Sequence, residues 1–312
     1  MATEKNCQFP STFSNGQDWP RISIVTPSYN QGEFIEATIQ SVLFQGYPNL
    51  EYIIIDGGSQ DGSIQVIKKY ERHLAYWHSK KDKGQADAIN QGMRLATGEV
   101  VGWINSDDMY LPGTLQEVSK RFTGKTNNCC LLYGSALTMQ QDSENLQGYA
   151  RVAGAFDAET LTYSDYIVQP STFWTRKLWI EVGELNASYH YVLDWEWFIR
   201  ASRITSFEYI PRFLSIYRLH GQNKTGTGGW KRIGEINDIV ERYAPENWRR
   251  FYRLVFSHYL RMIKIRRFLI KMRIPGCSFL LPFFSPGILR EGGVRSRARL
   301  MTVLHMYGMD RA

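Results

Sequence analysis

Two adjacent carboxylates stand out as groups that can do chemistry. Asp107 and Asp108 follow a short apolar run at residues 100–104. Carboxylates this close repel each other unless a cation or hydrogen-bond donors compensate their charge, and oxygen ligands are those that Mg²⁺ and Mn²⁺ prefer. The pair therefore predicts a divalent metal site. A helix N-cap is the alternative role for Asp108, because a helical pattern begins just after Pro112.

A glycine-rich loop carries a third candidate carboxylate. Asp56 follows the apolar run at residues 52–55 and opens a loop with glycines at positions 57, 58 and 62. Glycine lets the backbone approach a ligand closely, so we expect Gly58 to line a binding site and Asp56 to accept a hydrogen bond from a base N–H. The loop lacks the spacing of dinucleotide-binding and P-loop motifs. Asp61 has the alternative of capping the next helix.

The segment at residues 82–92 combines a lysine with polar residues of one helical face. Lys83 precedes a predicted helix at residues 84–96, in which Asp87 and Asn90 are three positions apart and share a face. Because the N-terminal end of a helix favours anions, this segment predicts contacts with an anionic ligand. A solvated helix face is the alternative.

Alternating strands and helices must position these groups. We expect strands at residues 22–26, 52–55, 75–77 and 100–104, with a loop and a helix after each of the first three. The alternation predicts an α/β fold with right-handed crossovers and a mostly parallel sheet, in which ligands bind outside the carboxyl ends of the strands. Asn30, Asp56 and the two adjacent carboxylates then converge on one edge. Further strands are expected near residues 130–133, 136–139 and 172–174, and helices near 177–182 and 194–202.

The uneven distribution of charge divides the chain. Of the 312 residues 43% are hydrophobic and 21% charged, which favours a folded chain over a disordered one. Residues 1–229 have a net charge of −4, and residues 230–312 have one of +11. We therefore expect a polar N-terminal segment at residues 1–20, an α/β domain at 21–229 and a helical, basic and aromatic region at 230–312.

The C-terminal region predicts an amphipathic helix with a basic face. From residue 250 onward, basic positions recur at steps of three or four, with apolar positions between them. The basic positions are Arg250, Arg253, Arg261, Lys264, Arg267 and Lys271, and the apolar ones include Trp248, Phe251, Val255 and Tyr259. With the phenylalanine-leucine patch at 277–289, this pattern favours peripheral contact with an anionic membrane surface. Packing on the α/β domain is the alternative, and nucleic acid is not expected because the acidic N-terminal part would repel its phosphates.

The chain has no sequence signal for export. Residues 1–19 lack the apolar core of a secretory signal, and no apolar stretch reaches the roughly 18 residues of a membrane-spanning helix. The four cysteines have no Cys-x-x-Cys spacing, which favours a reducing compartment. We expect a cytoplasmic protein that is peripheral at the inner face of the cell membrane.

Five segments in order resemble the motifs of inverting glycosyltransferases of family 2, which have the GT-A fold. They are Ile24-Val25-Thr26-Pro27-Ser28-Tyr29-Asn30, Asp56-Gly57-Gly58-Ser59-x-Asp61-Gly62, Asp82-Lys83-Gly84-Gln85 to Asn90-x-Gly92, Ala96-Thr97-Gly98 and Asn105-Ser106-Asp107-Asp108. The resemblance covers residues 21 to about 225. It implies a Rossmann-like sheet flanked by helices and transfer of a sugar from a nucleotide diphosphate donor, a UDP-sugar, with inversion.

The resemblance also implies roles for single residues. The implied donor-binding residues are Thr26, Pro27, Tyr29, Asn30, Asp56, Gly58, Lys83, Asp87, Asn90, Asp107 and Lys224, with Asp56 on the uracil edge. Asp108 would bind the Mn²⁺ or Mg²⁺ that bridges the diphosphate, with Asp107 beside it, and His220 would complete the metal sphere. A structural role is the alternative for His220. The family's metal motif usually begins with an acid where this chain has Asn105, which leaves the number of ligands open.

Two later segments, at residues 169–174 and 192–200, resemble the acceptor half of the family. By position Asp194 is the catalytic base and Glu196 its rival, and on a helix these two side chains point away from each other. The chain lacks a Gln-x-x-Arg-Trp segment, which argues against a processive synthase. The resemblance therefore implies transfer of a single sugar to a glycan or a lipid-linked acceptor of the cell envelope.

Two other functions compete with this interpretation. A sugar nucleotidyltransferase would need a basic glycine-rich loop after the first strand, and residues 26–32 contain neither Lys nor Arg. The second competitor is a non-catalytic glycan-binding protein or membrane scaffold of the same fold. Metal-dependent hydrolysis of a nucleotide sugar would separate the enzyme from such a scaffold.

Overall fold

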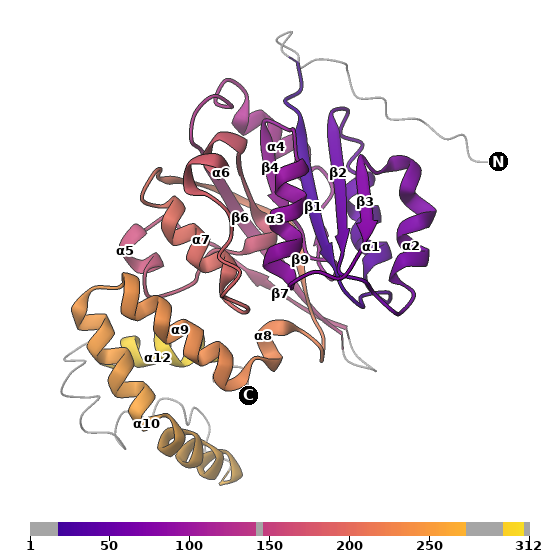
Figure 1. Ribbon diagram of the computed structural model, residues 1–312. Helices are drawn as coiled ribbons and strands as arrows, with labels where there is room; N and C mark the ends of the chain where they lie inside the picture. Colours follow the sequence, from indigo (N-terminus) through magenta and orange to yellow (C-terminus); the bar gives the residue numbers. More distant parts are fainter. Residues whose placement is uncertain (1–17, 142–145, 273–295, 309–312) are drawn as a thin grey trace. The chain divides into compact units, whose positions relative to one another are not determined.

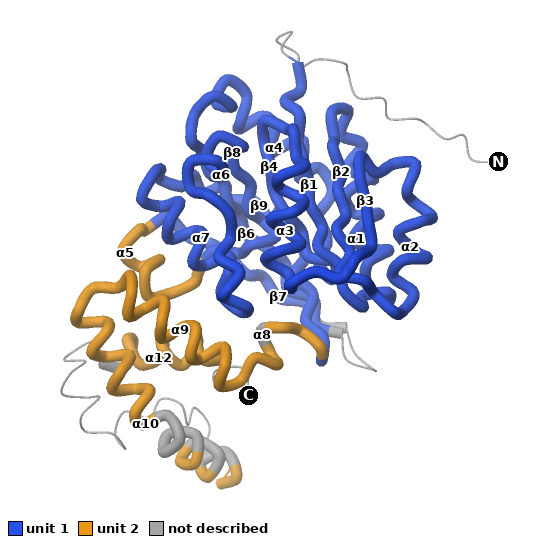
Figure 2. Tube along the Cα trace, in the orientation of Figure 1, with its two compact units in different colours: residues 1–156, 167–221 blue, residues 157–166, 222–312 orange. Residues whose placement is uncertain are grey.

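The chain forms two compact units. The computed structural model describes residues 18–141, 146–272 and 296–308. The first unit comprises residues 1–156 and 167–221, and the second comprises residues 157–166 and 222–312 (Figure 2). The division after residue 221 lies close to the predicted boundary after residue 229. It also assigns ten residues from the middle of the chain to the second unit, which composition did not indicate.

The first half of the first unit alternates strands and helices as predicted (Figure 1). The elements are β1 (Ile22–Ser28), α1 (Ile35–Leu43), β2 (Leu50–Asp56), α2 (Ser63–Tyr70), a short 3-10 helix (Glu71–His73), β3 (Tyr76–Ser79), α3 (Gln85–Leu95) and β4 (Val100–Trp103). The strands pair in parallel in the order β3, β2, β1, β4, and Ser28 is in register with Asp56. The carboxyl ends of β1 and β2 therefore lie side by side at one edge.

The second half of this unit continues the sheet with mixed strand directions. Its elements are β5 (Met109–Tyr110), α4 (Thr114–Phe122), β6 (Leu131–Gln141), β7 (Leu146–Arg151), a 3-10 helix (Gln169–Ser171), β8 (Thr172–Thr175), α6 (Arg176–Val182), α7 (Leu193–Ala201) and β9 (Phe207–Leu219). The order runs from β4 through β8, β6 and β9 to β5, and β7 pairs with β6. One strand, β6, replaces the two predicted at 130–133 and 136–139. Its pairing with β9 shifts register around Ser135, which explains the break in the sequence pattern.

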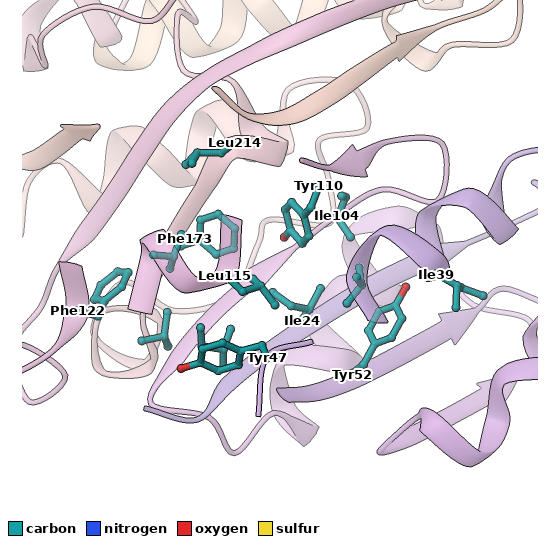
Figure 3. Close-up of a cluster of buried hydrophobic side chains, with 14 of the residues drawn as sticks. Ile24, Ile39, Tyr47, Tyr52, Ile104, Tyr110, Leu115, Phe122, Phe173 and Leu214 are labelled. Atoms are coloured by element: carbon teal, nitrogen blue, oxygen red, sulfur yellow. The ribbon is translucent and has the colours of Figure 1, made fainter. Parts of the chain in front are cut away.

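Apolar side chains on one face of the sheet form a large buried cluster. Residues of β1 and β2 pack there against α1, α2 and α4, and the cluster continues to Phe173 and Leu214 (Figure 3). On the other face α3 contacts β1 and β2, and a Cβ at Gly92 of this helix would collide with Val25. Glycine at this position therefore lets α3 lie close to the strands whose ends carry the candidate site.

Tryptophans hold α6 and α7 on the sheet. Trp197 of α7 packs against Trp174 of β8 at 4.8 Å between ring centroids, and against Trp179 of α6 at 5.3 Å. Trp174 and Trp197 are fully buried. α6 packs on both β8 and α7, and β8 runs antiparallel to β4.

The second unit is helical. It contains α5 (Ala158–Leu161), α8 (Lys224–Thr227), α9 (Gly229–Tyr243), α10 (Glu246–Lys271) and α12 (Ser296–Met306). Among the helices that the structure describes, none combines the length and the apolar composition that a membrane crossing requires. The amphipathic helix predicted from residue 250 onward is α10, and the patch at residues 277–289 lies outside the described residues.

The first half of α10 packs within its own unit, which corrects the predicted lipid contact of this stretch. Trp248 stacks on Tyr163 at 3.9 Å between centroids, and the Tyr252 hydroxyl donates to the Tyr163 carbonyl at 2.6 Å. Phe251 and Val255, both placed on the membrane-facing stripe from the sequence, are buried like Trp248. Because burying these side chains stabilises the unit, they are not available to a membrane.

A buried glutamate ties three segments together at the edge opposite the candidate site. Glu51 accepts hydrogen bonds from the Ser23 hydroxyl at 2.5 Å, the Thr97 amide at 2.7 Å and the Thr97 hydroxyl at 2.8 Å, and it pairs with Arg21 at 2.8 Å. Burial by itself would raise the pKa of Glu51, but these hydrogen bonds and the charge of Arg21 outweigh it and lower the pKa. The carboxylate form is therefore stabilised by the fold.

We expect Glu51→Gln to lower the free energy of unfolding by about 1–3 kcal/mol at pH 7, because buried donors lose a charged acceptor. A lowered pKa in the folded state means that this contribution is present above the ordinary glutamate pKa of about 4.3 and is lost as the pH falls through the folded-state value. Urea unfolding of both proteins between pH 7 and pH 3 measures this. The difference should shrink on acidification, and Glu71→Gln, an exposed control, should show no such trend.

Candidate functional site

The loops after β1 and β2 are joined into one rim at the carboxyl edge. The Asn30 amide donates to the Ser59 hydroxyl and the Gln60 amide to the Asn30 side chain, both at 2.8 Å, and the Gly32 amide donates to Asp61 at 2.8 Å. Asn30 has a φ of 51°, in the left-handed region that residues other than glycine seldom adopt. The hydrogen bonds from both sides hold this conformation, which is characteristic of constrained functional loops.

The Asp56 side chain holds the glycine-rich loop together by hydrogen bonds. Its carboxylate is fully buried and accepts from the Gly58 amide at 3.1 Å, the Ser59 amide at 2.8 Å and the Ser59 and Ser79 hydroxyls at 2.5 and 2.6 Å. Gly58 has a φ of 86°, and a Cβ there would lie 3.2 Å from the Lys81 amide nitrogen. The structure thus shows why this loop needs Asp56 and Gly58, and base recognition by Asp56 stays a prediction.

The residues predicted to line the base pocket differ in exposure. Thr26 and Pro27 are buried in β1, and the Thr26 hydroxyl lies 3.0 Å from the hydroxyl of Tyr52. Tyr29 projects from the rim with 62% of its surface exposed. Of these three, Tyr29 is the exposed side chain, and its contact with a base stays a prediction.

The first turn of α3 lies beside this rim, and its polar residues are not equivalent. Asp87 accepts from the Lys83 amide at 3.1 Å and from Gln91 at 3.0 Å, and it remains partly exposed. Asn90 is 95% buried, and its amide exchanges two hydrogen bonds of 2.9 Å with the backbone of Leu185. This geometry gives no support to a donor contact by Asn90.

The turn with the two carboxylates is held between α1 and β9. The Thr38 hydroxyl of α1 donates to the carbonyls of Ser106 and Asp108 at 2.8 and 2.7 Å. Directly after the turn, β5 pairs antiparallel with β9, with Met109 opposite Ile216. The end of β9 is therefore placed next to residues more than one hundred positions earlier in the chain.

Asp108 lies beneath the turn. It is fully buried, and its carboxylate accepts from the Arg218 amide at 3.0 Å and from Asn105 at 3.3 Å. Burial, reinforced by the charge of the neighbouring Asp107, raises the pKa of Asp108 well above its usual value. Each Asp108 oxygen thus faces a protein donor, and metal binding by Asp108 stays a prediction.

Asp107 pairs with a histidine just after the end of β9. Its carboxylate lies 3.0 Å from Nε2 of His220, with 19% of the Asp107 side chain and 8% of the His220 side chain exposed. The His220 ring stacks on the Phe34 ring at 4.2 Å between centroids. The Arg218 guanidinium lies 5.3 Å from the centroid of the Phe34 ring. Phe34 and Arg218 had no role in the sequence interpretation. The only local signal was the position of Arg218 in the segment that carries His220.

The pair Asp107 and His220 fits a metal that the donor helps to bind. Within the described residues, no group of three or more His, Cys, Asp or Glu side chains gathers in a metal-binding arrangement. Mg²⁺ and similar ions are commonly held by one or two protein ligands together with substrate phosphates and water. One carboxylate and one imidazole therefore suffice as the protein part of such a site. Lys224 belongs to the second unit, so its predicted phosphate contact stays a prediction.

The two acids of α7 have different surroundings. Glu196 is buried, and both of its carboxylate oxygens accept from Nε of Arg200 at 3.0 Å. Asp194, at the start of the helix, is partly exposed and accepts from the amide of Trp195 at 2.9 Å. Glu196 is thus the buried and ion-paired acid of the two, and the role of Asp194 as the base stays a prediction.

Known proteins resemble this chain in sequence. The family model described as "Glycosyl transferase family 2" matches residues 23–177. A "PGL/p-HBAD biosynthesis glycosyltransferase" of Mycobacterium bovis is 30% identical over 185 residues, which are 58% of this chain and 69% of the relative. An uncharacterized glycosyltransferase of Rickettsia typhi is 24% identical over 251 residues, which are 78% of this chain and 76% of the relative.

Solved structures share the fold at low sequence identity. TarS of S. aureus in complex with UDP-GlcNAc has a TM-score of 0.55 and 13% identity, over 93% of this chain and 91% of that one. The mannosyltransferase PcManGT of Pyrobaculum calidifontis, in complex with GDP-Man and Mn²⁺, has a TM-score of 0.56 and 16% identity, over 94% of this chain and 88% of that one. These similarities confirm the predicted GT-A fold.

Proposed function

The chain belongs to glycosyl transferase family 2, and on this premise we propose that it transfers a single sugar from a UDP-sugar to an acceptor hydroxyl with inversion. The observation that carries the proposal is the pair Asp107 and His220, at the edge where the loops after β1 and β2 form their rim. Structural neighbours were solved with UDP-GlcNAc and GDP-Man, which supports a nucleotide-sugar donor.

The rim would hold the nucleotide. Tyr29 offers an exposed aromatic face for the base, and such stacking contributes about 1–3 kcal/mol per base in other proteins. Lys83, exposed at the start of α3, would meet the negative charge of the diphosphate, and Asp87 would contact the nucleotide from the same helical turn. Asp56 would act mainly by holding the loop in which Gly58 approaches the donor.

Asp107 and His220 would hold the Mn²⁺ or Mg²⁺ that the family resemblance implies, and the Mn²⁺ in the mannosyltransferase neighbour supports this assignment. When bound, a divalent cation stabilises the charge that develops on a departing diphosphate. Asp108 would support the site from below by fixing the backbone of Arg218, two residues before His220. In this proposal Asp107 binds the metal, and Asp108 holds the backbone that positions His220.

Asp194 would remove the proton from the acceptor hydroxyl as that oxygen attacks the anomeric carbon. A base that activates the acceptor directly makes the transfer a single displacement, and a single displacement inverts the configuration at that carbon. Our proposal does not assign this role to Glu196, because both of its oxygens face Arg200. The acceptor that we propose is a glycan or a lipid-linked glycan of the cell envelope.

We also propose that the second unit contacts an anionic membrane surface with the far part of α10. Phe268 and Met272 are 62% and 58% exposed there, and Lys264 and Lys271 are exposed beside them. Arg253 is not part of this surface, because it pairs with Glu241 at 2.6 and 2.9 Å. Arg250 is exposed as well, and the side chains of Arg261 and Arg267 lie outside the described residues. A cytoplasmic location at the inner face of the membrane follows from this proposal.

Asp194→Asn should reduce the rate of sugar transfer by roughly 10²- to 10⁴-fold, the usual contribution of a positioned proton acceptor. Transfer from UDP-sugars to a panel of alkyl and p-nitrophenyl glycosides measures the rate, and calorimetry with UDP measures donor-site binding, which should not change. Glu181→Gln, an exposed acid on α6, is the matched control and should transfer at the wild-type rate. Full activity of the Asp194 variant would rule out its role as the base.

Asp107→Asn and His220→Ala should each abolish the tightening of UDP binding by Mn²⁺, because each removes one of two protein ligands. Calorimetric titration of UDP with Mn²⁺ and with EDTA measures the effect. We expect Mn²⁺ to strengthen binding to the wild type about tenfold or more, which corresponds to roughly 1.4 kcal/mol, and to leave the variants at the EDTA value. Retention of the Mn²⁺ effect in both variants would place the metal elsewhere.

The double variant Lys264→Glu and Lys271→Glu should bind anionic vesicles about tenfold less tightly or worse, since each cation near the surface contributes about 1 kcal/mol. Co-sedimentation with vesicles of phosphatidylglycerol and phosphatidylcholine measures binding, and added salt should weaken it by screening. The double variant Lys68→Glu and Lys120→Glu changes the net charge equally in the first unit. If both double variants lost binding to the same extent, the effect would come from net charge rather than from α10.

A further inference from the structure

The segment between α6 and α7 is held in place by hydrogen bonds to its backbone carbonyls. Nη1 and Nη2 of Arg200 donate to the carbonyls of Val182 and Glu184 at 2.6 and 2.7 Å, and the indole N–H of Trp197 donates to the Gly183 carbonyl at 2.8 Å. Three consecutive carbonyls thus bond to side chains of α7. We call residues 182–185 the anchored segment.

The fourth carbonyl of the anchored segment bonds to a helix of the donor half. Asn90 of α3 donates to the Leu185 carbonyl and accepts from the Leu185 amide, both at 2.9 Å. An amide side chain that pairs with both backbone groups of one residue fixes its position and its orientation. On the surface of the same helix, Arg94 pairs with Glu184 at 2.5 Å.

Building on the proposed function, we propose that Asn90 is a positioning residue that aligns the acceptor side of the site with the donor side. The anchored segment leads through residues 186–192 to Asp194, the first acid of α7. Because α7 also fastens the anchored segment, a shift of Leu185 would be transmitted to the start of that helix. Asn90 is the buried contact through which α3 limits this shift.

The N-terminal end of α3 contacts the turn at residues 105–108. Gln85, at the start of the helix, donates from its side chain to the Asn105 side chain at 2.8 Å, and Asn105 donates to Asp108 at 3.3 Å. One rigid helix therefore contacts both the turn with the carboxylates and the segment that precedes the base. Transfer requires the acceptor oxygen and the donor carbon to meet within a few tenths of an ångström, and such a helix can hold them in register.

Buried Glu196 has a clear place in this arrangement. Its two bonds to Nε of Arg200 orient the guanidinium, whose other nitrogens bond to the anchored segment. If Glu196 lost Arg200, its buried charge would be uncompensated. Removing either residue of the pair is therefore expected to destabilise the protein. Glu196 is thus a supporting residue of the acceptor side.

The test compares Asn90→Ala with Asn49→Ala. Asn49 also donates from its side chain to a main-chain carbonyl, that of Trp19 at 2.9 Å, but it lies at the opposite edge of the sheet. Three quantities are measured for each protein: sugar transfer from UDP-sugars to glycosides, hydrolysis of the same donors by water, and the calorimetric Kd of UDP. Hydrogen exchange of the peptide that covers residues 185–192 is followed in parallel.

We expect Asn90→Ala to lower kcat/KM for the acceptor by about tenfold or more, because displacing a reacting group by about 1 Å costs up to roughly 10²-fold. Hydrolysis and the Kd of UDP should change less than about twofold, and the peptide should exchange faster. Asn49→Ala should leave the ratio of transfer to hydrolysis unchanged. If Asn90→Ala does not fold, Arg200→Lys, which keeps the charge opposite Glu196 but loses the bonds to the carbonyls, should show the same selective loss.

Two results would overturn the proposal. Weaker UDP binding by Asn90→Ala would make Asn90 a donor contact, and an equal loss of transfer and hydrolysis would make its role one of general stability. Failure of the proposed function is distinguishable, because in that case the wild-type protein would neither transfer nor hydrolyse any UDP-sugar in the presence of Mn²⁺.

Discussion

The pairing of β5 with β9 is the contact on which the candidate metal site depends. β5 has only two residues, but its antiparallel register sets the end of β9 against the turn at residues 105–108. From there the Arg218 amide reaches Asp108, and His220 comes within 3.0 Å of Asp107. A long strand is rigid enough to carry this placement across the sheet. The pairing thus accompanies both of these contacts between β9 and the turn.

Burial separates the members of each acidic pair in this protein. Asp108 is enclosed and faces backbone and amide donors, whereas the side chain of Asp107 is 19% exposed and lies beside an imidazole. Glu196 is enclosed with Arg200, whereas Asp194 stays partly open at the start of α7. Burying a carboxylate costs free energy unless hydrogen-bond donors surround it. The buried member of each pair is surrounded by such donors and has a structural role. The more exposed member is the one that we propose to meet a ligand.

The second unit shows the same distinction for apolar surface. In the first half of α10, Trp248, Phe251 and Val255 are buried within their own unit, whereas Phe256 and, later along the helix, Phe268 are exposed. Periodicity predicted one continuous stripe, because a helix repeats regardless of its surroundings. What covers each part of a stripe depends on segments that are distant in sequence, such as residues 157–166.

The sequence by itself determined the alternation of strands and helices, the edge at which Asn30, Asp56 and Asp107 gather, and the family. These follow from local periodicity and from motifs of a few residues, which neighbouring side chains specify. Only the tertiary structure decided that Asp108 lies beneath the turn, that Glu196 pairs with Arg200 and that Asn90 bonds to Leu185. Spacing along the chain tells which way a side chain points but not which partner meets it. Partners come from strand order and helix packing, which join residues about a hundred positions apart, as in Asp107 with His220 and Asn90 with Leu185.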